Sequence, residues 1–282
     1  MSGVASSIGM KPLAASPRVI IPAVEFCCAT DTGRARSNNE DAVALEESAA
    51  LAVLADGMGG YNAGEVASTM ATSFIKNELG RWLEEAGTNA TDADVRRALD
   101  ICVDNANRAI FNAANSNPQY AGMGTTLVVA VFRDHRLLMG HVGDSRGYRL
   151  RAGRLTQITR DHSLLQEQID AGLITAEQAA FSSNKNLVTR AVGVEDTVLL
   201  EMHLHEVQPG DTYLMCSDGL SDMLDNDTIA QLLLANPSLE AAAEQLVAAA
   251  NEAGGKDNIS VILARSRGGA APAARSWWPF RR

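Results

Sequence analysis

The stretch Leu51–Gly60 (LAVLADGMGG) constrains the fold of this 282-residue chain more than any other segment. Its first five residues are apolar, and Asp56 and a glycine-rich run follow them. A continuous apolar run of this length predicts a short strand that is covered on both faces. We expect the strand to end at Asp56, where the backbone turns, and we expect Gly57 to let a ligand approach the backbone closely.

Three more aspartates stand in comparable places. Apolar runs lead to Asp144 in 139–145 (MGHVGDS) and to Asp218 in 213–219 (YLMCSDG), and Asp257 lies in a polar turn before the last apolar run. A single Asp-Gly pair most often marks a turn, so the repetition is what favours a shared site. Strand ends of one layered core lie near one another, and we therefore expect the four aspartates to converge.

Strands and helices are each predicted to cluster, without a regular alternation of the two. We expect strands at 24–29, 41–45, 51–55, 124–132, 136–141, 146–151, 198–207, 211–216 and 259–264, and helices at 63–83, 91–115, 161–172, 175–180, 226–234 and 238–253. Short polar connections between residues 124 and 151 predict an antiparallel meander of three strands. This arrangement indicates an α+β layered domain.

The chain is predicted to hold one domain at 22–265, because this range shows neither an internal repeat nor a clear linker. Residues 1–21 lack the apolar core of a signal peptide and predict a flexible extension. The tail 266–282 contains Trp277 and Trp278 among arginines. Its composition favours disorder, and weak docking to an anionic membrane surface or a partner groove is the alternative.

Charge and cysteine usage exclude some classes of function. A net charge of −10 argues against a nucleic-acid binder and suits a protein that concentrates carboxylates. The four cysteines form no CxxC pair and have no histidine at zinc spacing, which favours reduced thiols in the cytoplasm. His203 and His205 have no third ligand nearby in sequence, so we expect surface or packing roles for them. We expect a monomer.

Converging carboxylates need a countercharge, because mutual repulsion would otherwise raise their pKa values. Ligation by oxygen alone favours Mg²⁺ or Mn²⁺ over zinc. A carboxylate-held pair of ions roughly 3.5–4 Å apart suits phosphoryl transfer to water. Arg36 is the natural phosphate ligand, although its polar segment 30–47 also fits a solvated loop. The chain has no phosphate-binding loop for nucleotides, which favours hydrolysis of a phosphoester over transfer from ATP.

Six motifs together resemble those of the metal-dependent PP2C-type protein phosphatases, in the order of that family. They are RSNNED (36–41), ADGMGG (55–60), GTTL (124–127), GDSR (143–146), SDGL (217–220) and KDNIS (256–260). DGMGG and TRDHSLLQEQIDAGLIT (159–175) are similar to the bacterial branch. The resemblance covers about 25–265. It implies a four-layer α-β-β-α sandwich with two central antiparallel sheets flanked by helices.

The same resemblance implies hydrolysis of phosphoserine and phosphothreonine in proteins by a metal-activated water, without a phosphoenzyme, in opposition to a serine/threonine kinase. It implies two to three Mn²⁺ or Mg²⁺ ions. Asp56 would bridge two of them and the Gly57 carbonyl would bind one. Asp218 and Asp257 would hold the other, and Asp144 with Asp218 would serve a weaker third ion.

Three further positions carry over from the RSNNED motif. Glu40 and Asp41 would act on the ions through water, and Arg36 would bind the phosphate. Neighbouring strand residues point to opposite faces, so a bulge or bridging water is needed if Glu40 and Asp41 serve the same ions. Strand ends alone select only the four aspartates.

The chain departs from the family pattern in two places. Met58 stands where eukaryotic relatives have a histidine that is proposed as general acid, so the leaving group must take its proton from elsewhere. The flap segment 181–190 reads FSSNKNLVTR, where bacterial relatives often read HP-x-x-N-x-x-TR. Arg190 keeps the pattern, whereas Ser182 and Ser183 are expected to alter substrate preference.

Two other functions remain open at this stage. The chain could be a catalytically weak interaction module with the same fold, which binds a regulatory partner through the flap or the tail. It could also be a structural cation binder without chemistry. A degenerate ligand set would favour the interaction module, and every ligand position named above is filled. A turnover assay separates the structural cation binder.

Overall fold

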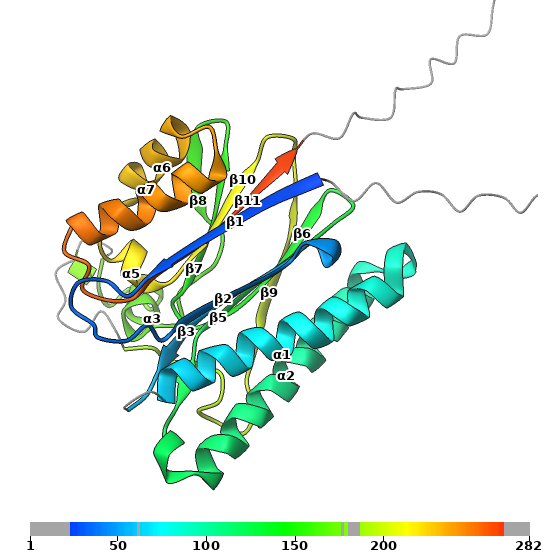
Figure 1. Ribbon diagram of the computed structural model, residues 1–282, viewed down its shortest axis with the longest axis vertical. Helices are drawn as coiled ribbons and strands as arrows, with labels where there is room; N and C mark the ends of the chain where they lie inside the picture. The colour runs from blue at the N-terminus through cyan, green and yellow to red at the C-terminus, as the bar shows by residue number, and fades with distance from the viewer. Residues whose placement is uncertain (1–22, 61–62, 176–177, 180–186, 268–282) are drawn as a thin grey trace, which may run out of the picture.

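The computed structural model describes residues 23–60, 63–175, 178–179 and 187–267. In these residues two antiparallel sheets face each other, and a pair of helices covers the outer face of each sheet (Figure 1). The predicted α+β fold, a four-layer sandwich, is therefore confirmed. No helix in these ranges is long and apolar enough to cross a membrane.

The first sheet has the strand order β2-β3-β5-β6-β9, and β4 pairs with β3 beside this path. Its strands are β2 (Asp41–Glu46), β3 (Leu51–Met58), β4 (Gly124–Thr125), β5 (Leu127–Arg133), β6 (Arg136–Val142) and β9 (Glu201–Glu206). The long helices α1 (Ala63–Ala86) and α2 (Asp92–Ser116) pack on its outer face. Thr91 caps α2 in a reciprocal bond pattern with Asp94, which confirms the predicted start of this helix.

The second sheet has the strand order β1-β11-β10-β7-β8. Its strands are β1 (Ala23–Asp31), β7 (Arg146–Arg151), β8 (Arg154–Gln157), β10 (Thr212–Cys216) and β11 (Ile259–Arg267). Helices α6 (Asn226–Ala235) and α7 (Leu239–Glu252) cover this sheet, and the short α5 (Asp218–Ser221) follows β10. Ser238 caps α7 through a bond from the Ala241 amide, at the predicted start of this helix.

The apolar core lies in three layers, because each sheet packs on both of its faces. In β3 the side chains of Leu51 and Val53 face α1 and α2, whereas Ala52 and Leu54 face the second sheet. Phe132 and Tyr213 meet edge to face between the sheets, with ring centroids 5.4 Å apart. The prediction of a β3 strand covered on both faces is confirmed, and its burial explains why the run is apolar without alternation.

The predicted three-stranded meander is wrong for its third strand. β5 and β6 pair with each other, but β7 pairs with β8 and β10 in the second sheet. The second edge of β6 pairs with β9. The chain leaves the first sheet after β6, at Gly143, where φ is +99°. β9 and β10, which follow each other in the chain, lie in different sheets.

Several predicted boundaries also move. β3 continues past Asp56 to Met58, because Gly57 pairs with Thr125 of β4, so Asp56 does not end the strand. The helix predicted at 161–172 is α3 (Leu164–Asp170), which begins after the capping residue Ser163. The strand predicted at 198–207 begins only at Glu201. Strand β8 and helix α5 were not predicted.

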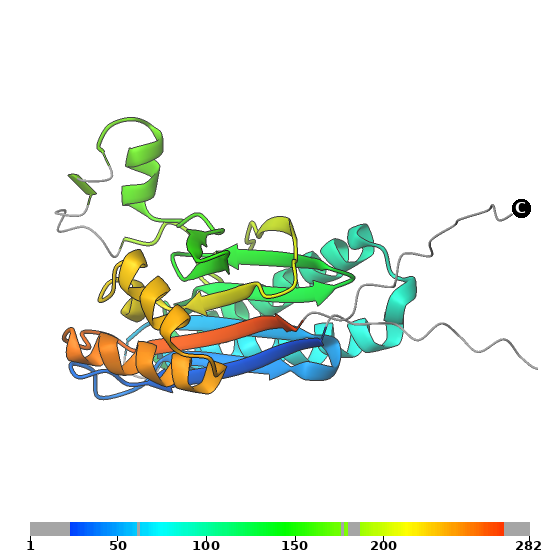
Figure 2. The same cartoon turned by 90° about the horizontal axis from the view of Figure 1, so that it is seen from above.

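Other predictions fall wholly or partly outside the described residues. The extension 1–21 and residues 268–282 of the tail lie outside, and the helix predicted at 175–180 is described only in part. β11 runs to Arg267, so the first two residues assigned to the tail belong to a strand. Figure 2 shows α3 standing out from one end of the sandwich, the end at which the connection between β1 and β2 also lies.

Candidate metal centre and active site

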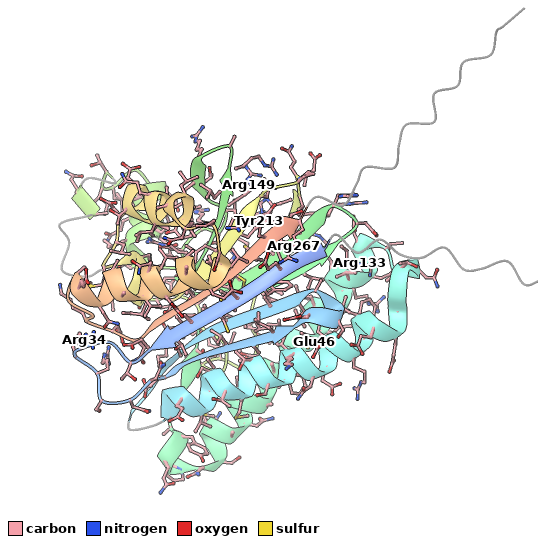
Figure 3. The ribbon with its side chains drawn as sticks, turned by 45° about the horizontal axis from the view of Figure 1, so that its top comes forward. Arg34, Glu46, Arg133, Arg149, Tyr213 and Arg267 are labelled. Carbon is pink, nitrogen blue, oxygen red and sulfur yellow. The ribbon has the colours of Figure 1, made fainter. Side chains whose placement is uncertain are left out.

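One cavity of about 230 Å³ collects the predicted ligands, except Asp41, from five separate stretches of the chain. Its walls are formed by Arg36, Glu40, Asp56, Gly57, Met58, Gly59, Thr126, Asp144, Val188, Asp218, Asp257 and Asn258. The expectation that the four aspartates meet is thus met by the fold. The backbone amide of Arg34 donates to the Gly255 carbonyl at 2.7 Å, which joins two of these stretches at the end of the sandwich opposite Arg133 (Figure 3).

Strand pairing places Asp41 and Asp56 side by side. The register of β2 and β3 sets the two residues directly opposite each other. Asp41 accepts a hydrogen bond from the Ser217 hydroxyl at 2.8 Å, and its second carboxylate oxygen is buried without a hydrogen-bond partner among the described residues. A buried oxygen of this kind is costly unless a ligand satisfies it, so it supports a cation at this point.

Thr126 fixes the backbone on the other side of Asp56. The Thr126 hydroxyl accepts a hydrogen bond from the Asp56 amide at 3.0 Å, and the Thr126 amide donates to the Asp56 carbonyl at 2.9 Å. The same hydroxyl lies 2.7 Å from the hydroxyl of Ser145, next to Asp144. Thr126 therefore couples two aspartates of the cavity, and its place in the GTTL motif was the only sequence signal for this role.

Asn258 holds the loop of Glu40 against the start of β11. Its side-chain oxygen accepts from the Glu40 amide at 2.8 Å, and its side-chain nitrogen donates to the carbonyls of Thr32 and Asn38 at 2.9 and 2.8 Å. These bonds tie Asp257, the preceding residue, to the loop that carries Arg36. No role had been assigned to Asn258, although it lies within the KDNIS motif.

Burial and mutual repulsion raise the pKa values of several carboxylates at the site. Burial raises the pKa of Asp41 and of Asp144 to about 6, and nearby aspartates add to the effect. Burial, followed by the charges of neighbouring aspartates, raises the pKa of Asp56 and of Asp218 well above its usual range. A donor set made only of oxygen atoms, with a surplus of negative charge, fits hard divalent cations.

Arg36 faces a carboxylate directly. Its guanidinium lies 2.7 Å from Asp257, and about half of the Arg36 side chain is exposed (53%). The charge of Asp257 raises the pKa of Arg36, so the guanidinium stays protonated. Glu40 also lines the cavity, and its carboxylate lies against Gly64 at the start of α1. Glu40 and Asp41 thus project in different directions.

The flap positions are only partly described. Ser182 and Ser183 lie outside the described residues. Arg190 is exposed, and its guanidinium lies 3.4 Å from a ring nitrogen of His162. Val188 reaches the wall of the cavity, so the end of the flap segment borders the site.

Gly57 has no room for a side chain. A Cβ atom there would lie 2.1 Å from the Gly64 carbonyl oxygen and 2.6 Å from the Glu40 carbonyl oxygen. Both obstacles are backbone atoms. We expect Gly57→Ala to lower the free energy of unfolding by about 1–3 kcal/mol and to weaken Mn²⁺ binding, which denaturant titration and calorimetry would measure.

Gly60→Ala is the matched control for Gly57→Ala, since a Cβ at Gly60 would meet no atom of the described residues within 4 Å. It should change neither quantity. A Gly57→Ala variant with native stability would contradict this expectation, and would show that the backbone at Gly64 and Glu40 moves to admit the methyl group at little cost.

The fold and the site together define a class of protein. Two facing antiparallel sheets with helix pairs outside, and an acidic cavity of oxygen ligands where the sheets end, are the features of metal-dependent protein phosphatases. The model of one family, protein phosphatase 2C, matches residues 30–264. The chain belongs to this family.

Individual relatives agree with this assignment. The serine/threonine protein phosphatase PstP of Mycobacterium tuberculosis is 40% identical over 242 residues, which are 86% of this chain and 45% of that protein. The match thus covers less than half the length of this relative. The serine/threonine phosphatase stp of Listeria monocytogenes is 37% identical over 237 residues, which are 83% of this chain and 92% of that one.

A solved structure extends the likeness to three dimensions. The catalytic domain of PstP, in complex with two manganese ions, matches with a TM-score of 0.76 at 37% identity, and the match covers 87% of this chain and 99% of that one.

Proposed function

We propose that this chain hydrolyses phosphoserine and phosphothreonine in proteins, in opposition to a serine/threonine kinase. The observation that carries the proposal is the convergence of Asp56, Asp144, Asp218 and Asp257 in one cavity. Family membership supports a metal-dependent reaction, and the two manganese ions in the PstP structure support the kind of ion.

The residues of the cavity suit two to three Mn²⁺ or Mg²⁺ ions. We assign Asp56 and the Gly57 carbonyl to the first pair of ions, together with Asp218 and Asp257. Glu40 and Asp41 would act through water, and the weaker third ion would be held by Asp144 with Asp218. When bound, such ions lower the pKa of water and neutralise the charge of a phosphate group.

Arg36 supplies the cation that orients the phosphate. Its planar, permanently charged guanidinium matches two phosphate oxygens, and it would exchange its contact with Asp257 for the substrate. Met58 lines the same cavity with a thioether, which has no proton to transfer. The leaving alkoxide must therefore take its proton from another group.

Arg36→Ala should raise KM for a phosphothreonine peptide about tenfold, because a charge-assisted hydrogen bond to phosphate is worth about 1.5–3 kcal/mol. The affinity for Mn²⁺ should stay unchanged. Arg34→Ala is the matched control, since Arg34 belongs to the same segment but does not line the cavity. Steady-state kinetics and calorimetry would measure both, and a loss of Mn²⁺ binding in Arg36→Ala would contradict the phosphate role.

The proposal is tested by turnover of a phosphothreonine peptide with Mn²⁺ and after addition of EDTA. Turnover that EDTA abolishes is expected. If the chain binds Mn²⁺ but shows no turnover, the structural cation binder is favoured. If it shows no turnover but captures a partner through the flap or tail, the interaction module is favoured.

The setting of the enzyme is proposed as well. All four cysteines are unbridged, which suits a reducing cytoplasm. We propose a monomer whose partners are phosphorylated proteins and a cognate kinase. Light scattering of the full chain would test the monomer.

A further inference from the structure

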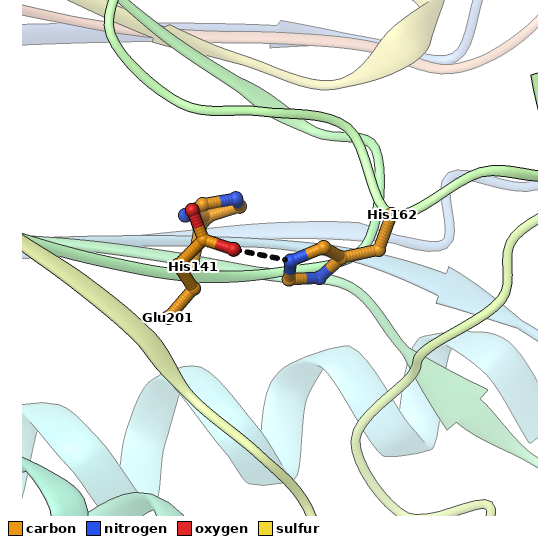
Figure 4. A group of neighbouring side chains, drawn as sticks. All are labelled: His141, His162 and Glu201. Carbon is orange, nitrogen blue, oxygen red and sulfur yellow. Dashed lines mark hydrogen bonds and ion pairs between the residues drawn. The ribbon is translucent and has the colours of Figure 1, made fainter. Parts of the chain in front are cut away.

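A second group of titratable side chains lies beside the acidic cavity. His141 of β6, His162 of the segment before α3, and Glu201 at the start of β9 place one ligand atom each within 4.8 Å of the other two (Figure 4). The rings of His141 and His162 stack with centroids 4.7 Å apart. The three residues come from distant parts of the chain, so no sequence spacing predicted this group.

The hydrogen bonds show where the proton of His162 sits. The backbone amide of Gly143 donates to Nδ1 of His162 at 3.1 Å, so Nδ1 carries a lone pair. The proton of the neutral ring is therefore on Nε2, which donates to Glu201 at 3.1 Å. The other oxygen of Glu201 accepts from His203 at 2.7 Å.

These protons argue against a metal ion in this group. A cation on Nε2 of His162 would displace the proton to Nδ1, where it would oppose the Gly143 amide. The guanidinium of Arg190, 3.4 Å from Nε2, adds a positive charge at the same point. The group is better described as a carboxylate that orients a histidine, as second-layer carboxylates do elsewhere.

His162 is joined to a single residue, Gly143, by two hydrogen bonds. Besides the bond to Nδ1, the His162 amide donates to the Gly143 carbonyl at 2.9 Å. Gly143 has φ +99°, and a Cβ there would lie 2.8 Å from the side chain of Thr126. Glycine adopts this φ without strain, and the contact with Thr126 leaves no room for a larger residue. The residue that follows it is Asp144, on the wall of the cavity.

The same segment also holds the end of the flap. The His162 carbonyl accepts from the Thr189 amide at 2.8 Å, and the Leu164 amide donates to the Leu187 carbonyl at 2.9 Å. Asp161, the residue before His162, forms a largely buried ion pair with Arg146 at 2.6 Å. The motif around 161–163, which had no assigned role, therefore joins the Asp144 turn to the flap.

We propose that His162, oriented by Glu201, is a positioning residue that fixes the Gly143–Asp144 turn and thereby sets the affinity of the cation at Asp144. The inference rests on the proposed role of Asp144 in holding the weaker third ion. It assigns no contact between His162 and the substrate or the ions.

Two substitutions separate the role of Nδ1 as an acceptor from the role of Nε2 as a donor. The side-chain oxygen of asparagine can stand near Nδ1, so His162→Asn keeps an acceptor for Gly143 and loses the donor to Glu201. The side-chain nitrogen of glutamine can stand near Nε2, so His162→Gln keeps the donor and loses the acceptor. The exposed His203, which bonds the same carboxylate but not Gly143, offers the control His203→Ala.

The experiment is a calorimetric titration of the full chain with Mn²⁺. His162→Gln should weaken the lowest-affinity Mn²⁺ about tenfold, because a buried amide loses its acceptor. His162→Asn should weaken it less, and His203→Ala should match the wild type. The tighter ions should bind all three variants as they bind the wild type. Amide exchange of the metal-free chain should quicken around Gly143 in His162→Gln, without a change in the core strands.

The outcomes separate this inference from the proposed function. If Asp144→Asn removes the weakest Mn²⁺ while His162→Gln leaves it unchanged, the positioning role is refuted and the role of Asp144 stands. If Asp144→Asn removes no Mn²⁺, both fail. Uptake of one Zn²⁺ that is lost in His141→Ala and in Glu201→Gln would also overturn the inference, and would make the group a metal site.

Discussion

Asp56→Asn should lower metal-dependent turnover about 10³-fold and, at the same time, raise the melting temperature of the metal-free chain. The loss follows because ions that stabilise charge in the transition state contribute several kcal/mol, and each 1.36 kcal/mol is tenfold in rate. Asp56 faces Asp41 across the β2–β3 pair and is proposed to hold two ions.

The gain in stability has the same physical origin. Burial and neighbouring aspartates raise the pKa of Asp56 well above its usual range, so the folded, metal-free chain tolerates this carboxylate poorly at pH 7.5. Asparagine has nearly the same shape and no charge. A rise of about 2–4 °C in the melting temperature is expected for each 1 kcal/mol of repulsion that is removed in a domain of this size.

Peptide turnover and thermal unfolding in EDTA would measure the two effects. Asp100→Asn, an exposed carboxylate on α2, is the control and should change neither. An Asp56→Asn chain that keeps its turnover would overturn the site assignment. A variant that loses turnover and is less stable without metal would show that Asp56 carries structural bonds that outweigh its repulsion.

Mn²⁺ should stabilise the chain strongly at pH 7.5 and only slightly at pH 5. The pKa values of Asp41 and Asp144 are raised from 3.8 to about 6 in the metal-free fold. Below pH 6 protons therefore compete with the cation. Each of these two carboxylates should weaken Mn²⁺ binding about tenfold per pH unit there, because the ligand must first lose its proton.

Lowering the pH has the opposite effect on the metal-free chain, because protonation of these two carboxylates stabilises its fold. An acid whose pKa is higher in the folded state than in the unfolded state stabilises the fold at low pH, and this contribution falls as the pH rises from about 4 to 6. Burial lowers the pKa of His141 and His162, so their contribution is lost as the pH falls.

The measurement is that difference across pH 5–8, together with the protons released when Mn²⁺ is added at pH 6. Release of at least one proton is expected, since Asp41 and Asp144, each with a pKa of about 6, are each about half protonated at pH 6. A difference in melting temperature that does not vary with pH would contradict the raised pKa values, whatever the turnover of the enzyme.

Much of the fold could be predicted because it depends on local rules. The apolar run Leu51–Ala55 predicted a strand covered on both faces, and the helices predicted from 91 and from 238 begin at the capping residues Thr91 and Ser238. Family motifs added the four-layer architecture. The partner sheet of β7 could not be predicted, since a short connection after β6 suits a hairpin as well as a crossing to the other sheet.

The site divides in the same way. Strand endings and motif order selected Asp56, Asp144, Asp218 and Asp257, and the fold places them on one cavity. Nothing in the spacing of His141, His162 and Glu201 indicates that they meet. The three bonds of the Asn258 side chain to the loop before β2 are equally invisible in sequence.

The sequence by itself determined which residues carry charge, which segments are apolar enough to be buried, and where helices start, because these properties depend on a residue and its near neighbours. Only the tertiary structure decided that Asp56 lies within a strand rather than at its end, that Gly143 turns the chain from one sheet to the other, and that His162 supports this turn. Each of these depends on hydrogen bonds and contacts between residues far apart in the chain.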